Sequence, residues 1–142
     1  MSGCPVHACK VIGTRTVTVE GRVFSGEGTG TLFVNLPWAK KQFENKLKFS
    51  PYPGTLNLRV SSETAIEALK DTTRGIRIEA SEGFYSGRCF EAVVSDRVCG
   101  AVVVPDVPGY PSDVLEILAP VNLREELGLE DGMEVVLTIW LE

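Results

Sequence analysis

Short segments with the period-two pattern of β-strands recur along this sequence, and glycine, proline or aspartate separates them. In residues 14–24, Val17, Val19 and Val23 share one face and polar residues occupy the other. No long helix alternates with these segments, which argues against a doubly wound parallel sheet. The pattern instead predicts a mainly β protein, a small antiparallel barrel with short helical insertions. Further strands are expected at 31–36, at the end of 51–60, and within 75–80, 87–94, 98–105, 114–120 and 133–141.

Three segments change to helical periodicity. In residues 37–47, Ala39, Phe43 and Leu47 recur every four positions behind a proline, which is typical of an amphipathic helix. Residues 61–70 predict a second short helix that opens at a serine. A third is expected from Asn122, which has capping-box spacing to a glutamate, to a C-terminal cap at Gly128.

Length and charge limit the possible classes of protein. The 142 residues predict one domain, 1–142, in which 1–13 form a poorly ordered or peripheral N-terminal extension. The net charge of −5 argues against a general nucleic-acid-binding protein, which usually carries a basic face. No apolar run approaches the ~20 residues of a membrane helix, and the N-terminus lacks the apolar core of a signal peptide. A cytoplasmic monomer is therefore expected.

The cysteines and the single histidine raise the question of a zinc site. Cys4 and Cys9 flank His7, but Cys89 and Cys99 have nine residues between them and lie in two predicted strands. Structural zinc sites usually combine two close pairs, so reduced cysteines are the better interpretation.

The segment Gly26–Gly30, in the sequence SGEGTG, is unusually rich in glycine for a chain between two strands. These glycines could form a wide hairpin turn, or their backbone N–H groups could bind phosphate oxygens. No lysine and Ser/Thr pair follows the last glycine, so the segment is not a P-loop. The sequence leaves the two interpretations open.

Two further segments carry candidate site residues. In PGTLN, Thr55 and Asn57 point to the same side of an extended chain and offer the hard oxygen ligands that Mg²⁺ accepts beside phosphates and water. They could equally satisfy loop backbone. The second segment is LEILAPVNLREELGL, residues 115–129. Strand alternation there favours a Glu116 side chain that faces solvent over one that is held for a function. Arg124 and the helix start beside it could bind an anion or only pair with surface carboxylates.

Taken in order, GRVFSGEGTG, PYPGTLNLRV, GAVVVP and VLEILAPVNLREELGLEDGMEV resemble the archaeal CTP-dependent riboflavin kinase family over about residues 20–137. The combination of PGTLN with LEILAPVNLRE is the most specific part. The resemblance implies a six-stranded barrel of the cradle-loop type. It also implies transfer of the γ-phosphoryl group of CTP to the 5′-hydroxyl of riboflavin, with Mg²⁺, to give FMN and CDP.

The resemblance also implies roles for individual residues. Thr55 and Asn57 would hold the magnesium ion, and Glu116 would contact the flavin. Because Glu116 is a carboxylate on an apolar strand beside this site, we further hypothesise that it orients or deprotonates the flavin hydroxyl. The loop at 106–113 lacks the family's usual threonine, so Ser112 and Tyr110 are weaker candidates for a second flavin contact. The implied nucleotide-binding residues are Gly26, Glu27, Gly28, Thr29, Gly30, Thr31, Leu32, Val121, Asn122, Leu123 and Arg124.

Two other functions remain open. The C-terminal segment LREELGLEDGMEVVLTIW also looks like the swapped-hairpin motif of AbrB-type transcription regulators, although the acidic charge balance and the PGTLN segment do not fit a DNA-binding module. A flavin- or nucleotide-binding protein without catalysis would share all the sites above.

Overall fold

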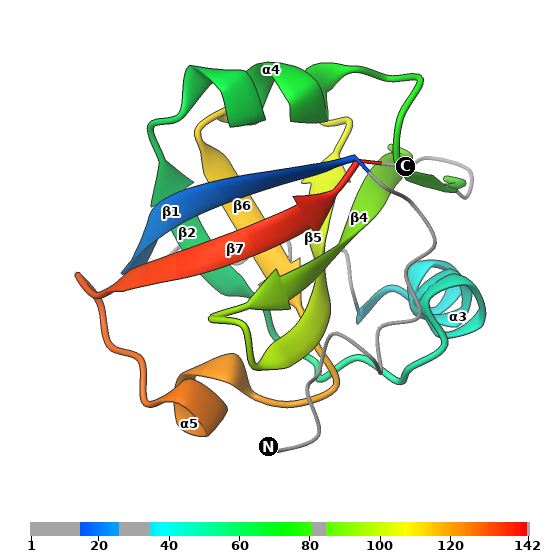
Figure 1. The fold of residues 1–142 in the computed structure, drawn as a ribbon. Coiled ribbons are helices and arrows are strands. Elements are labelled where there is room, and N and C mark those ends of the chain that lie inside the picture. Colours follow the sequence, from blue (N-terminus) through cyan, green and yellow to red (C-terminus); the bar gives the residue numbers. More distant parts are fainter. Residues whose placement is uncertain (1–14, 26–34, 81–84, 142) are drawn as a thin grey trace.

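The computed structural model describes residues 15–25, 35–80 and 85–141. These residues form seven strands in one antiparallel sheet with the order β3-β4-β5-β6-β2-β1-β7, and an additional pairing of β4 with β7 closes it. Six strands thus form a closed barrel, as predicted, and β3 lies at the edge of β4 (Figure 1). The strands are β1 (Thr16–Phe24), β2 (Leu56–Val60), β3 (Ile76–Ile78), β4 (Gly87–Val94), β5 (Val98–Pro105), β6 (Val114–Leu118) and β7 (Glu134–Trp140).

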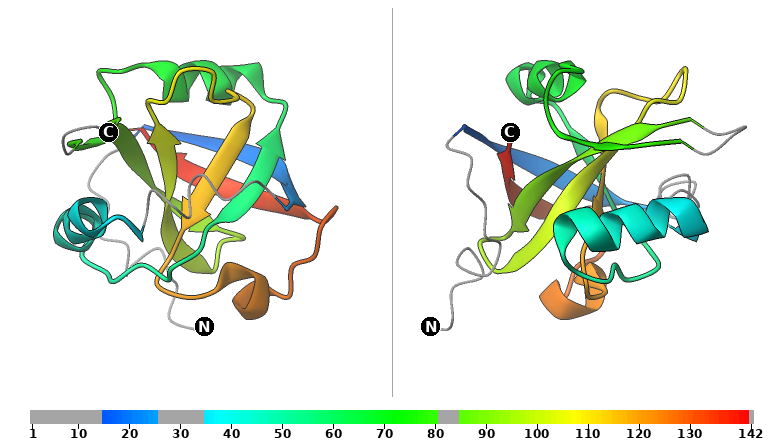
Figure 2. Two further views of the ribbon diagram at one scale, coloured as in Figure 1. Left: turned by 180° about the vertical axis from the view of Figure 1, so that it is seen from behind. Right: turned by 90° about the vertical axis from the view of Figure 1, so that its right-hand side faces the viewer.

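Within the described ranges three short helices accompany the barrel, each in a predicted segment: α3 (Pro37–Leu47), α4 (Glu63–Lys70) and α5 (Leu123–Leu127). α4 crosses one end of the barrel, and α5 lies at the opposite end (Figures 1 and 2). α3 packs against the side of the barrel. Side-chain caps start two of them: Ser62 accepts a hydrogen bond from Ala65 N, and Asn122 accepts one from Glu125 N. Gly128 ends α5 with a φ of 65°, a conformation that glycine adopts without strain.

Two hydrophobic clusters bury the two faces of the sheet. One fills the barrel interior and includes Val19, Leu58 and Leu137. The other lies outside the barrel, where Phe43 and Leu47 of α3 cover Val103 and neighbouring strand residues. The part of the sheet formed by β3–β6 is buried on both faces, because α3 covers its outer face. Side chains on either face of these strands can therefore be buried.

Some sequence-based expectations need correction. Met133 was expected to share the apolar face of the last strand, but it precedes β7 and is exposed. Cys99 is disulfide-bonded rather than reduced, whereas Cys89 is a free, buried thiol. Spacing along the chain does not reveal which cysteines the fold brings together. Cys4, His7, Cys9 and most of the strand predicted at 31–36 lie outside the described residues.

No helix in the described ranges has the length and apolar character needed to cross a membrane.

Candidate functional site

Thr55, Asn57 and Glu116 meet on the outer face of β2 and β6. The antiparallel register places Asn57 directly opposite Glu116, while the next pair, Leu56 and Ile117, points into the barrel. Thr55, two residues before Asn57, lies on the same side of the chain, and its hydroxyl donates a 3.0 Å hydrogen bond to Oε1 of Glu116. The two candidate metal ligands and the candidate catalytic carboxylate therefore form one cluster.

Glu116 is buried, at 3% exposure, so the solvent-facing orientation favoured by strand alternation is wrong. Alternation fails as a guide because both faces of β6 are covered: Ile117 packs in the barrel, and Leu118 packs in the cluster beneath α3. Burial of a carboxylate requires compensating donors. Thr55 supplies one, and the hydroxyl of Tyr110 donates a short hydrogen bond to Oε2.

A cavity of about 140 Å³ adjoins this cluster at the α5 end of the barrel. It brings Thr55 together with Val121, Asn122, Leu123 and Arg124, which are 66 or more residues away in sequence. The remaining described lining residues are Tyr52, Gly54, Leu56 and Ile117. Ligand pockets usually measure about 300–1,000 Å³, so these residues alone account for only part of a nucleotide site.

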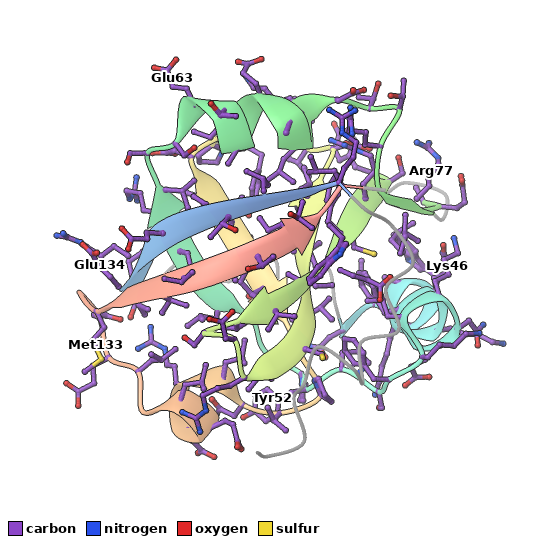
Figure 3. All side chains as sticks on the ribbon, in the orientation of Figure 1. Lys46, Tyr52, Glu63, Arg77, Met133 and Glu134 are labelled. Atoms are coloured by element: carbon purple, nitrogen blue, oxygen red, sulfur yellow. The ribbon has the colours of Figure 1, made fainter. Side chains whose placement is uncertain are left out.

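Tyr52 is a site residue that the sequence did not reveal as one. Its backbone N–H donates to Ala119 O at 2.7 Å, which ties the segment before PGTLN to the end of β6. Its hydroxyl accepts a 3.1 Å hydrogen bond from Nδ2 of Asn122, so it also fixes the start of α5. Figure 3 places Tyr52 at the α5 end of the barrel, far from Glu63 of α4.

Arg124 is held at the cavity by Asp131. The guanidinium donates to Oδ1 of Asp131 at 2.7 Å and to Phe24 O at 3.4 Å, and Ser25 donates to the other carboxylate oxygen at 2.8 Å. The hydrogen bond from Arg124, followed by that from Ser25, lowers the pKa of Asp131. Asp131 therefore stays ionised and orients Arg124, a role that its position in a surface turn did not indicate.

The candidate nucleotide loop, Gly26–Leu32, lies outside the described residues, but both of its flanks are next to the cavity. Ser25, on one side, bonds Asp131. Asn35, on the other, donates a 3.4 Å hydrogen bond to Pro53 O, beside Gly54. Ser25 and Asn35 therefore lie at the same end of the barrel.

A second cavity, of about 260 Å³, lies at the α4 end. Tyr110 and Ser112, the two candidates for a second flavin contact, line it together with Leu69 of α4, Val104 and Leu115. Lys70, Arg88 and Asp106 also line it, so the wall combines apolar side chains with polar and charged groups that can orient a small organic ligand. Glu116 lies between the cavities, because Thr55 from the first and Tyr110 from the second both donate to it.

The donor set fits a hard cation that retains other ligands. Thr55 and Asn57 offer a hydroxyl and an amide oxygen, both of which Mg²⁺ accepts, and the Glu116 carboxylate lies beside them. Among the residues that the structure describes, no group of three or more His, Cys, Asp or Glu side chains could hold a metal ion. A cation here would therefore depend on water or on phosphate groups for most of its shell.

The described residues thus define a closed antiparallel barrel with a buried carboxylate between two cavities, of about 140 and 260 Å³, an arrangement suited to a binding protein or enzyme for small molecules. Comparison of the sequence with known proteins identifies the family within this broad class of small-molecule-binding proteins and enzymes. The model of the family described as domain of unknown function DUF120, with the short name CTP-dep_RFKase, matches residues 23–139. The chain belongs to this family.

Curated relatives carry the name riboflavin kinase. The chain is 44% identical over 126 residues to the one from Methanosarcina barkeri, covering 85% of this chain, and 41% identical over 131 residues to that from Archaeoglobus fulgidus, covering 86%. It spans 56% of the length of each of these two relatives. A riboflavin kinase from Sulfolobus acidocaldarius is 38% identical over 133 residues, which cover 89% of this chain and 84% of that protein.

Proposed function

We propose that this chain is a riboflavin kinase that transfers the γ-phosphoryl group of CTP to the 5′-hydroxyl of riboflavin, which yields FMN and CDP. Membership of the family and the names of the relatives support the kinase activity. The observation that carries the proposal is the position of Glu116, which accepts hydrogen bonds from a wall residue of each cavity. A phosphoryl-transfer enzyme needs such a junction, where donor and acceptor meet in line.

The nucleotide would occupy the α5 end of the barrel. Val121, Asn122 and Leu123 would contact the cytidine nucleotide, and Arg124 would balance phosphate charge. Backbone N–H groups of residues 26–32 would bind phosphate oxygens, a task for which glycine allows close approach.

Mg²⁺ would be held by Thr55 and Asn57 and would neutralise charge on the phosphates when bound. Thr55 suits this role because its hydroxyl proton is directed to Glu116, and a hydroxyl oriented in this way by a carboxylate is a better ligand for a cation.

Riboflavin would bind from the α4 end, with its hydroxyl at Glu116 and its remaining contacts at Ser112 and Tyr110. Glu116 would orient the 5′-hydroxyl and accept its proton as the new P–O bond forms. Because phosphoryl transfer depends mostly on positioning and charge neutralisation, a carboxylate that is held rigidly is well suited to it.

The test is a turnover assay with riboflavin and Mg²⁺ in which CTP, ATP, GTP and UTP are supplied separately and FMN is detected by chromatography. We expect FMN mainly with CTP. FMN formed mainly with ATP would retain the kinase and contradict the proposed donor. No FMN with any donor, from folded protein that binds riboflavin, would favour a non-catalytic binding protein, and salt-dependent DNA binding without flavin binding would favour an AbrB-like regulator.

Glu116→Gln tests the catalytic residue, and Glu63→Gln, on the exposed start of α4, is the matched control. We expect Glu116→Gln to lose turnover by about 10²–10⁴-fold, the usual contribution of general acid–base catalysis. Full turnover of Glu116→Gln at neutral pH would exclude the general-base role.

A further inference from the structure

Tyr110 reaches Glu116 from the loop that joins β5 to β6. Its ring lines the cavity at the α4 end, while its hydroxyl donates a short hydrogen bond to Oε2 of Glu116. Oε1 of the same carboxylate accepts from Thr55, so donors from two different segments hold both oxygens. Glu116 is thereby oriented by one residue from each cavity.

The backbone of this loop fixes the position of Tyr110. Gly109 has a φ of 82°, which turns the chain, and the N–H of Tyr110 donates to Val107 O at 3.0 Å. The end of the loop is tied to β2, because Val60 N donates to Asp113 O at 2.8 Å. A side chain on a backbone anchored in this way can hold its partner in one orientation.

The phenol of Tyr110 is a donor throughout the neutral range. Burial, then the hydrogen bond to Glu116 and the charge of that carboxylate, raise the pKa of Tyr110 above its ordinary value. A phenol that remains protonated has one O–H to donate, and Glu116 receives it.

We propose that Tyr110 is a positioning residue that acts on the reaction through Glu116. This inference rests on the proposed kinase function. Tyr110 and Thr55 together set the orientation of the carboxylate, and an ionised carboxylate has about four lone-pair sites, so it can still accept the hydroxyl of a substrate. This positioning role differs from a direct contact between Tyr110 and the flavin, because the effect of Tyr110 on the reaction rate depends on the presence of Glu116.

The hydrogen bond itself is tested without any substrate. Tyrosine labelled with ¹³C at Cζ is observed by NMR at neutral pH, and the Tyr110 signal is assigned from its absence in Tyr110→Phe. We expect this signal to lie at a different chemical shift in Glu116→Gln than in the wild-type protein, because the carboxylate that accepts the phenol proton is gone. An unchanged Tyr110 signal would show that the two residues do not interact and would overturn the proposal.

Kinetics separate positioning from flavin binding. A hydrogen bond to a charged group contributes enough to change a rate by about tenfold to a hundredfold. We expect Tyr110→Phe to lower kcat by this factor, with the KM for riboflavin changed by less than about threefold. Tyr85→Phe, at an exposed tyrosine, is the control. A higher KM at unchanged kcat would identify Tyr110 as a direct flavin contact instead.

A double-mutant cycle with Glu116→Gln completes the test. If Tyr110 acts through Glu116, Tyr110→Phe should cost little further activity once the carboxylate is absent. Additive losses would overturn the proposal. If the folded wild-type protein makes no FMN, the proposed function and this role fail together, whereas the NMR comparison at neutral pH still decides whether Tyr110 and Glu116 are in contact.

Discussion

The hydroxyl of Thr55 lies 3.0 Å from Oε1 of Glu116, although 61 residues separate the two in the sequence. The contact joins the cavity at the α5 end to the buried carboxylate of β6. Hydrogen bonds of this type fix the orientation of a metal ligand as well as that of the carboxylate. Thr55 therefore connects the proposed metal site to the orientation of Glu116, and the Mg²⁺ dependence of a Thr55 variant tests the metal site.

Thr55→Val retains the shape of the side chain and removes the hydroxyl. We expect the Mg²⁺ concentration that gives half-maximal FMN formation to rise about 10–100-fold, the usual effect of changes around a metal ligand. Thr18→Val, on an exposed position of β1, is the control. Unchanged Mg²⁺ dependence in Thr55→Val would contradict the assignment of Thr55 as a metal ligand.

Arg124 is predicted to bind nucleotide phosphate. We expect Arg124→Met to raise the KM for the nucleotide at least about tenfold, since a charge-assisted hydrogen bond to phosphate is lost. Asp131→Asn should raise this KM less, because Arg124 keeps its charge and loses only an exposed partner. Arg22→Met, which breaks the exposed ion pair with Glu134 on another part of the barrel, is the control. Equal KM values for Arg124→Met and Arg22→Met would contradict the role.

Much of the barrel was predictable from local pattern. β1 was identifiable because one face is exposed, so Val19 and Val23 alternate with polar residues. α3 was identifiable because one face packs against the sheet and Ala39, Phe43 and Leu47 recur at helical spacing. Caps at Ser62 and Asn122 defined the other two helices.

The parts of the site that depend on distant contacts were not predictable. The burial of Glu116 results from Tyr110, Thr55 and the packing of α3, none of which is adjacent to it in sequence. Tyr52 and Asp131 acquire their roles only because the fold places them beside Asn122 and Arg124. The resemblance to a family predicted that residues 121–124 bind the nucleotide. Periodicity gave no indication that these residues and Thr55 line the same cavity.

Gly100 allows close approach of β5 to the end of β6. A Cβ atom at this position would lie 2.4 Å from the backbone oxygen of Leu118, an atom that cannot move aside without disturbing the strand. We expect Gly100→Ala to lower the free energy of unfolding by about 1–3 kcal/mol or more, as for overpacking of a core. Urea denaturation measures the change. Gly109→Ala is the comparison: its φ is 82° and its Cβ would meet no atom of the described residues within 4 Å, so backbone strain of about 1–2 kcal/mol is the cost expected from them.

Cys89 is predicted to be inert in the folded protein. Burial raises the pKa of its thiol to about 12, so thiolate at pH 8 amounts to about one molecule in ten thousand. We expect iodoacetamide to leave Cys89 unmodified in native protein and to modify it in urea, as read by mass spectrometry of the peptide. Equal rates in the two conditions would show that β4 opens readily or that the side chain is accessible.

Asp71 gives the chain a predicted pH dependence of stability. It follows α4, and its carboxylate accepts hydrogen bonds from the hydroxyl and N–H of Thr73 and from Arg74. These interactions, the Thr73 hydroxyl first, lower the pKa of Asp71 to about 2 from an ordinary value of 3.8. A carboxyl whose pKa is lower in the folded state stabilises it fully above the unfolded pKa, and the effect is lost as pH falls from about 4 through 2.

Asp71→Asn should therefore be less stable than the wild-type protein at pH 7, and the difference in urea midpoint should shrink between pH 4 and pH 2. The residue is exposed, so the difference will be small, and a direct measure is needed beside it. Titration of the ¹³C carboxyl signal of Asp71 provides this measure, with Asp96, an exposed aspartate in the turn between β4 and β5, as the internal comparison. If the Asp71 signal titrates near pH 4, Thr73 and Arg74 do not hold the carboxylate, and the stability difference should then be independent of pH over this range.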